Sequence, residues 1–263
     1  MELNLSGRHA VVCGASQGIG RATAIELAGL GADVTVLARS VDVLEELAQS
    51  LPRNHPAQRH DWRGVDMHDT HALHAVAHDI VATHPVHILI NNTGGPPGGP
   101  AHTAEAAAFE NTFRQHLLAG QVLMQAMLPG MREARFGRLV NVISTSVKEP
   151  IPGLGVSNTV RAAVAAWAKT LSGELAADGI TVNNVLPGYT RTARLAGLLS
   201  AQSKKSGRSE EELAAEMAAA VPARRFGEPG EVAAVIAFLC TPAAAYVNGV
   251  SIAVDGGRTK ALS

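Results

Sequence analysis

Short apolar segments alternate with longer alanine-rich segments along the chain, and this alternation constrains the fold more than any other feature. We expect strands at 10–13, 33–38, 87–90, 138–143, 181–186 and 251–254. We expect helices at 19–30, 41–51, 70–83, 104–134, 156–177 and 228–239. Because each short apolar run is followed by a helix, the strands are predicted to form a parallel sheet with helices on both faces. The predicted fold class is therefore α/β, a Rossmann-type doubly wound parallel sheet.

The chain is predicted to form a single domain over residues 1–263. No Pro-, Gly- or Ser-rich linker divides it, and no repeat is present. The Gly/Pro-rich segment 92–100 directly follows an expected strand, so we interpret it as a loop beside the active site. Segment 193–220 is alanine-rich with a polar centre, and we expect it to form a helical lid over the substrate.

Composition excludes several classes of protein. The formal net charge is −1 and no block of Lys or Arg is present, which argues against nucleic acid as a partner. No apolar run approaches the ~18 residues that would span a membrane. Two cysteines cannot form a disulfide framework, and the first residues lack the pattern of a secretion signal. We therefore expect a cytoplasmic protein with no membrane partner.

The sequence CGASQGIG at 13–20 lies between the first expected strand and the first expected helix. Glycines there let the backbone approach a pyrophosphate, and the N-terminus of the helix offers its unpaired N–H groups. The alternative is an ordinary glycine-rich turn. This position favours a dinucleotide site, whose expected residues are Gly14, Ser16, Gln17, Gly18, Ile19 and Gly20.

The residues after the second expected strand predict the choice of cofactor. An acidic side chain there would bind the ribose hydroxyls of NAD. This chain has Arg39 and Ser40 instead. A guanidinium can hold the 2′-phosphate of NADP with two hydrogen bonds, so we predict NADP(H). The alternative is that Arg39 is a solvated surface residue.

Further motifs follow in order: VDMHD at 65–69, NNTG at 91–94, NVIS at 141–144, PG at 187–188, RFGEP at 225–229 and VDGG at 254–257. With the glycine pattern, they give the chain an end-to-end resemblance to the short-chain dehydrogenase/reductase family, with a general similarity to 3-oxoacyl-carrier-protein reductases. The resemblance implies cofactor contacts at Asp66, Met67, Asn92, Thr93, Gly94, Pro187, Gly188, Thr190 and Thr192. It also implies a homotetramer or dimer built partly through the helices at 104–134 and 156–177.

The resemblance breaks at the catalytic residues. The family pairs a Tyr with a Lys four residues later, and the register from Ser144 puts Ser157 and Arg161 at these positions. His116 occupies the position of a family Asn. Residues four apart share a helix face, so Ser157 and Arg161 can still bind the nicotinamide ribose. The resemblance gives Ser144 the role of orienting the substrate oxygen.

The unusual pair leaves the proton donor open. An aliphatic alcohol is a far weaker acid than a phenol, whose pKa is ~10, and a guanidinium is not normally deprotonated. His116 is the first candidate, because an unperturbed imidazole titrates at ~6.5. The alternative for His116 is a purely structural role. Tyr189 is the second candidate.

Two functions fit these observations. The first is an NADP(H)-dependent oxidoreductase that interconverts a small-molecule carbonyl and an alcohol. The second is a catalytically impaired nucleotide-binding protein, a sensor or partner subunit, and the Ser157/Arg161 pair favours it. The substrate pocket is expected at 95–102, 146–154 and 189–215, whose composition gives no polar signature. Ser146 and Lys148 either line this pocket or belong to a plain loop.

A metal site is not predicted. His74 and His78 have a spacing that can ligate zinc, but no acidic residue or cysteine is arranged near them. We interpret them as part of a solvated helix face.

Overall fold

The strands form one seven-stranded sheet in which all neighbouring strands run parallel. The computed structural model describes residues 1–262. The strand order is β3-β2-β1-β4-β5-β6-β7, which confirms the doubly wound Rossmann-type prediction. The strands are β1 (His9–Cys13), β2 (Asp33–Ala38), β3 (His60–Gly64), β4 (Ile88–Asn91), β5 (Gly137–Val142), β6 (Ile180–Pro187) and β7 (Ser251–Val254).

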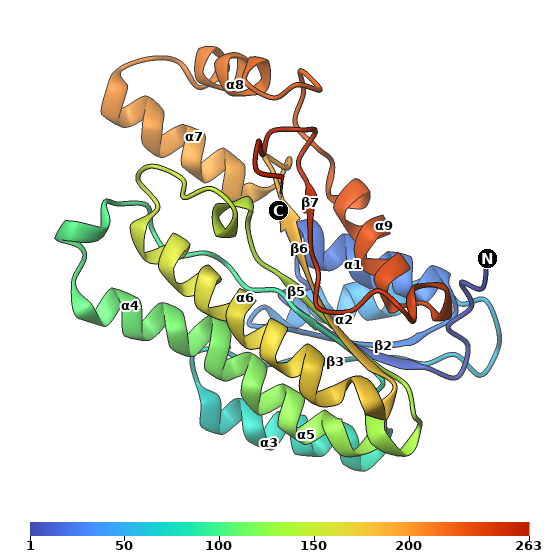
Figure 1. The fold of residues 1–263 in the computed structure, drawn as a ribbon. Coiled ribbons are helices and arrows are strands. Elements are labelled where there is room, and N and C mark those ends of the chain that lie inside the picture. Colours follow the sequence, from blue (N-terminus) through green and yellow to red (C-terminus); the bar gives the residue numbers. More distant parts are fainter. Residues whose placement is uncertain (263) are drawn as a thin grey trace.

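Helices cover both faces of the sheet (Figure 1). One face carries α1 (Gly18–Gly29), α2 (Val41–Ser50) and α9 (Pro229–Cys240). The other carries α3 (Thr70–Thr83), α5 (Ala119–Glu133) and α6 (Gly155–Leu175). The remaining helical segments are α4 (Ala106–Phe113), α7 (Ala193–Ser206), α8 (Glu210–Ala219), the π turn η2 (Arg114–Leu118) and the 3₁₀ turns η1 (Ala101–Thr103), η3 (Thr145–Val147), η4 (Ala176–Asp178) and η5 (Pro242–Ala244).

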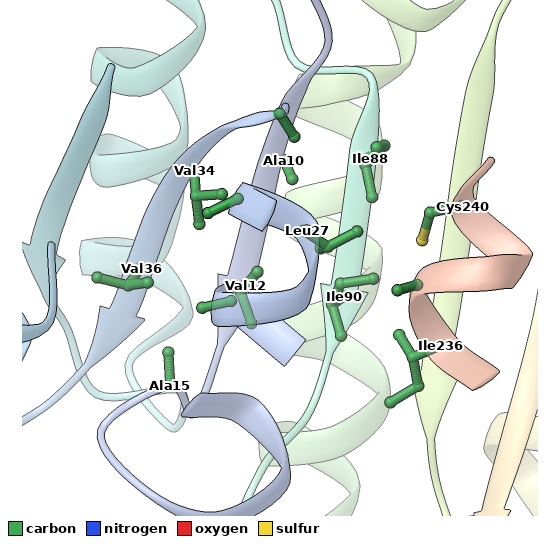
Figure 2. Close-up of a cluster of buried hydrophobic side chains, with 14 of the residues drawn as sticks. Ala10, Val12, Ala15, Leu27, Val34, Val36, Ile88, Ile90, Ile236 and Cys240 are labelled. Atoms are coloured by element: carbon green, nitrogen blue, oxygen red, sulfur yellow. The ribbon is translucent and has the colours of Figure 1, made fainter. Parts of the chain in front are cut away.

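The core is built from branched strand residues against alanine and leucine on the helices. Figure 2 shows Val12, Val34 and Ile88 on neighbouring strands beneath Leu27 of α1. These side chains are almost completely buried. Stiff branched residues suit the pleated sheet, while small alanines let the helices approach it closely. This packing explains why the chain needs so few aromatic residues.

The edge strand β3 was not predicted from the sequence. Its residues, HDWRG, contain no apolar run, and their burial is only partial. β3 pairs with β2 alone, so one of its edges faces away from the sheet. An edge strand of this kind does not need the continuous hydrophobicity that marks the buried strands.

The long helix expected at 104–134 is interrupted. It begins at Ala106, and the π turn η2 separates α4 from α5. A single π turn inserts a wider ring into the α-helical hydrogen-bond pattern, and such turns are frequent at functional sites. His116 lies in this turn and is buried.

A chain of buried amides crosses four neighbouring strands. Asn91 Nδ2 donates to Asn141 Oδ1 at 2.9 Å, and Asn141 Nδ2 donates to Asn184 Oδ1 at 3.0 Å. Asn184 Nδ2 then donates to Ser251 Oγ at 3.1 Å. These residues are paired in register across β4, β5, β6 and β7. The amide chain therefore ties the register of these strands to side-chain hydrogen bonding.

We predict that Asn141→Ala destabilises the fold by about 2–4 kcal/mol, because it leaves the amides of Asn91 and Asn184 buried and without their partners. Urea unfolding followed by circular dichroism, at one fixed protein concentration, measures this loss. Gln125→Ala, at an exposed position of α5, is the control. A loss below about 0.5 kcal/mol, the range of an ordinary surface substitution, would contradict the prediction.

Candidate cofactor and active site

The glycine-rich loop joins β1 to α1 in a conformation that favours glycine. Gly14 and Gly18 have φ values of +60° and +57°. Asn92 Nδ2, from the segment after β4, contacts the carbonyl oxygens of Cys13 and Gly14, each at 3.3 Å. Gln17 precedes α1 and provides no side-chain cap, so the first N–H groups of the helix remain open to an anion.

The predicted adenosine-side residues lie away from the main cavity. Arg39 and Ser40 are exposed at the carboxyl end of β2. Ser40 precedes α2, and its hydroxyl does not cap that helix. Hydrogen bonds from His68 chiefly hold the pKa of Asp66 below its ordinary value, and the Arg39 charge contributes. Met67 is buried nearby.

A cavity of about 280 Å³ brings together residues from both halves of the sheet. It opens at the carboxyl ends of β1, β4, β5 and β6, where doubly wound folds bind their ligands. The predicted site residues that line it are Gly14, Gln17, Gly18, Ile19, Asn92, Thr93, Gly94, Ser144, Ser157, Arg161, Pro187, Gly188, Tyr189, Thr190 and Thr192. Ser16 of this loop and Gly20 in the first turn of α1 do not line the cavity.

Ser144, Ser157 and Arg161 meet in this cavity. Ser144 Oγ accepts a hydrogen bond from the Ser146 amide at 3.0 Å, which leaves the hydroxyl proton free to donate. Arg161 Nη1 donates to the carbonyl oxygen of Val142 at 3.0 Å. Burial, reinforced by the charge of Arg194, lowers the pKa of Arg161 to about 10. Arg161 is still a cation at neutral pH.

His116 lies behind this cavity rather than in it. It borders a separate void of about 10 Å³, together with Asn91 and Asn141. Its Nδ1 lies 2.6 Å from Thr93 Oγ1, and Thr93 borders both spaces. Burial, followed by the charge of Arg161, holds the pKa of His116 well below its ordinary value. The imidazole is therefore neutral at physiological pH.

The cavity has a polar character that the sequence did not indicate. Arg194 and Arg258 line it in addition to Arg161. Arg194 follows Thr192 by two residues, so its proximity to a motif was a usable signal. Arg258 directly follows the VDGG motif, but its place beside Thr145, 113 residues away, depends on the tertiary fold. The expectation of a pocket without polar signature is wrong for this reason.

Other flagged residues lie outside the cavity. Ser146 is buried beneath it, and Lys148 does not line it. The Nε2 atoms of His74 and His78 approach to 3.2 Å. Within residues 1–262, no cluster of three or more metal-ligating side chains is found. None of the helices in this same part of the chain is both long and apolar enough to cross a bilayer.

Comparison with known proteins places the chain among reductases. A family model described as "Enoyl-(Acyl carrier protein) reductase" matches residues 14–259. The chain is 31% identical over 262 residues to the NADPH-dependent reductase BacG of Bacillus subtilis, a match covering 98% of this chain and 100% of that protein. It is 32% identical over 260 residues to the 3-oxoacyl-[acyl-carrier-protein] reductase FabG of Vibrio cholerae, covering 97% and 98% respectively.

A solved structure of a reductase has the same fold. The L-sorbose reductase of Gluconobacter frateurii, complexed with NADPH and L-sorbose, superposes with a TM-score of 0.92. It is 30% identical to this chain, and the match covers 100% of both chains.

We predict that the neutral His116 makes stability depend on pH. In the unfolded chain a histidine binds a proton below about 6.5, whereas the folded chain excludes that proton. The free energy of unfolding therefore falls as pH drops below about 6.5. Urea unfolding between pH 8 and 5 should show that the free energy of unfolding falls less steeply in His116→Asn than in the unmodified protein. His9 and His87, whose pKa values burial lowers to about 4, contribute to the remaining fall, as does His60, whose pKa burial also lowers.

His102→Asn, at an exposed position, is the control and should keep the slope of the unmodified protein. An unchanged slope in His116→Asn would contradict the prediction.

Proposed function

This chain belongs to the short-chain dehydrogenase/reductase family, and we propose that it is an NADP(H)-dependent oxidoreductase interconverting a carbonyl group and an alcohol. The observation that carries this proposal is the convergence of Ser144, Ser157 and Arg161 in one cavity with the glycine-rich loop. Relatives described as an NADPH-dependent reductase and as a reductase complexed with NADPH support it. These relatives favour an active enzyme over the alternative, a nucleotide-binding protein that has lost catalytic activity.

The residues present fit a dinucleotide. A Cβ on Gly14 would lie 2.5 Å from the Asn92 carbonyl oxygen, so only glycine lets this loop turn tightly against the segment after β4, as the pyrophosphate loop of a dinucleotide site requires. The uncapped N-terminus of α1 supplies N–H donors. Arg39 and the uncapped hydroxyl of Ser40 would hold the 2′-phosphate. When bound, the cofactor supplies the hydride.

Arg161 and Ser144 act on the oxygen of the substrate. Ser144 donates its free proton to the carbonyl oxygen and so orients it. As negative charge develops on that oxygen, the Arg161 cation stabilises it. Ser157, one turn from Arg161 on α6, is placed to bind the ribose beside the nicotinamide.

We assign proton donation to Tyr189 rather than to His116. Tyr189 lines the cavity, and its hydroxyl makes no hydrogen bond within residues 1–262. His116 reaches the cavity only through Thr93, and its neutral state at physiological pH makes it a weak direct acid. His116 then serves to hold Thr93 at the cavity wall.

We propose that α7 and α8 form the lid over the substrate. Thr192 accepts a hydrogen bond from Leu195 N at 3.4 Å and so begins α7 at the cavity edge. Leu195 and Leu198 line the cavity from this helix. Both helices project beyond the carboxyl ends of the strands (Figure 1).

We also propose a cytoplasmic location. Cys13 and Cys240 are free and buried, and burial raises the pKa of each thiol to about 12. Unreactive, unpaired thiols are compatible with a reducing compartment.

We predict a preference for NADPH that depends on Arg39. Initial rates with NADPH and NADH, measured over a panel of ketones and oxo acids, should favour NADPH at least tenfold. Arg39→Asp should reverse the preference, because a carboxylate repels the 2′-phosphate and binds the ribose hydroxyls of NADH. Arg53→Asp, at an exposed position beyond α2, is a charge-matched control. Equal rates with both cofactors in the unmodified protein would contradict the proposal.

We predict that Tyr189→Phe lowers kcat about 10²–10⁴-fold, the usual contribution of a positioned general acid. The binding of NADPH, followed by its fluorescence, should not change. His116→Gln should keep the pH–rate profile of the unmodified protein. If kcat instead collapses in His116→Gln and survives in Tyr189→Phe, the proton comes through His116.

We predict a homo-oligomer, a tetramer or dimer, formed partly through α4, α5 and α6. Phe113 precedes the π turn and Leu118 ends it, and these side chains remain 37% and 36% exposed, which leaves an apolar surface to cover. Light scattering at micromolar concentration should give at least twice the chain mass of 27.3 kDa. Glu substitutions at both positions should lower that mass. A monomer mass for the unmodified protein would refute the assembly.

A further inference from the structure

The cavity beside Ser144 is strongly cationic. Its lining includes the guanidinium groups of Arg161, Arg194 and Arg258. Among the described residues, no Asp or Glu side chain lines it. Positive groups gathered in a cleft with low-dielectric walls focus the field and concentrate anions. This arrangement concerns the substrate class, which the proposed function leaves open.

The protein does not neutralise these charges. Other arginines pair with carboxylates, as Arg132 does with Asp178 at 2.8 Å. Within residues 1–262, none of the three cavity arginines has a carboxylate oxygen within 4.0 Å. Each is held by a neutral acceptor: Arg161 by Val142 O at 3.0 Å, Arg194 by Pro96 O at 2.7 Å and Arg258 by Thr145 Oγ1 at 3.3 Å. Their other N–H groups remain for a ligand.

Two of the cations converge on one point. A Cβ placed on Gly95 would lie 3.5 Å from Nη2 of Arg161 and 3.5 Å from Nη2 of Arg194. Like charges brought together in a partly desolvated site are unfavourable unless an anion offsets them. The absence of a side chain at Gly95 keeps the space between them open.

Arg258 lies at the Ser144 side of the cavity. It contacts Thr145, the residue after Ser144, and its guanidinium carbon lies 4.5 Å from the centre of the Tyr189 ring. The nearby Asp255 carboxylate is used by the backbone instead, accepting from the amides of Gly257 and Thr259 at 3.0 and 2.7 Å. That turn presents Arg258 to the cavity as an unpaired cation.

The cofactor accounts for the other end of the site. In the proposed function, the glycine-rich loop binds its pyrophosphate, and Arg39 and Ser40 bind its 2′-phosphate. Neither phosphate explains a cation placed next to Ser144 and Tyr189. Guanidinium groups bind carboxylate and phosphate oxygens with paired hydrogen bonds.

We propose that the substrate is an anionic carbonyl compound whose carboxylate or phosphate binds Arg258, with its carbonyl oxygen at Ser144. Arg194 and Arg161 add positive potential to the same cavity. The proposal rests on the reductase function above and names its substrate class. A cavity of about 280 Å³, which the nicotinamide must share, favours a small oxo acid or a short phosphorylated ketone.

Matched pairs of substrates test the proposal. We would measure initial rates with NADPH for phenylglyoxylate, acetoacetate and dihydroxyacetone phosphate, each against its neutral partner: the methyl esters of the two acids, and dihydroxyacetone. The unmodified protein should prefer the anionic member of at least one pair at least tenfold in kcat/KM. The pair that shows this preference tells whether the substrate is a 2-oxo acid, a 3-oxo acid or a phosphorylated ketone.

Arg258→Gln should lower that anionic preference by about ten- to a hundredfold. An indirect effect through Tyr189 would lower kcat/KM for both members of a pair alike. The ratio of the anionic to the neutral member would then be unchanged. Arg258→Lys should retain part of the preference, and Arg132→Gln, far from the cavity, is the control. Preference for the neutral members, or a ratio that survives Arg258→Gln, would overturn the proposal.

If no compound is reduced, calorimetry separates the two proposals. The three anions would be titrated into the protein saturated with NADP. Binding to the unmodified protein that weakens at least tenfold in Arg258→Gln supports the anion site and counts only against the reductase function. If none of the three anions binds, the proposed anion site is overturned.

Discussion

The parallel direction of all seven strands is the constraint on which the site depends. Because the strands point the same way, their carboxyl ends meet at one edge of the sheet. The winding order reverses between β1 and β4, and the crevice there receives the glycine-rich loop from one side and Ser144 from the other. The amide chain from Asn91 to Ser251 fixes the register of the strands that carry this edge.

The sequence predicted the parts of the structure that local patterns encode. Glycines with positive φ can be read from a spacing, and so can buried strands and a Ser–Arg pair four residues apart on a helix. The strand β3 was missed because an edge strand can be polar, and the π turn at His116 has no marker in the residue pattern. Arg258 was missed because its position depends on tertiary contacts far along the chain.

In the function that we propose, the site would keep a positive charge beside the substrate oxygen, while the proton would come from a residue outside position 157. Arg161 is a cation where the family has Lys, and its charge helps to keep His116 neutral. A phenol is absent from position 157, but Tyr189 provides one on another wall of the cavity. The unpaired arginines leave the cavity with an excess of positive charge that the protein itself does not balance.

In the proposed function, this cavity transfers a hydride without the tyrosine–lysine pair of the family. The most direct measurement uses NADPH carrying deuterium at C4, each stereoisomer in turn, with a mixture of small oxo acids, phosphorylated ketones and neutral ketones. Mass spectrometry would then follow the alcohols formed. We expect an alcohol that gains one deuterium from one stereoisomer and none from the other. Deuterated alcohol from neither isomer, while NADPH binding is retained, would contradict it.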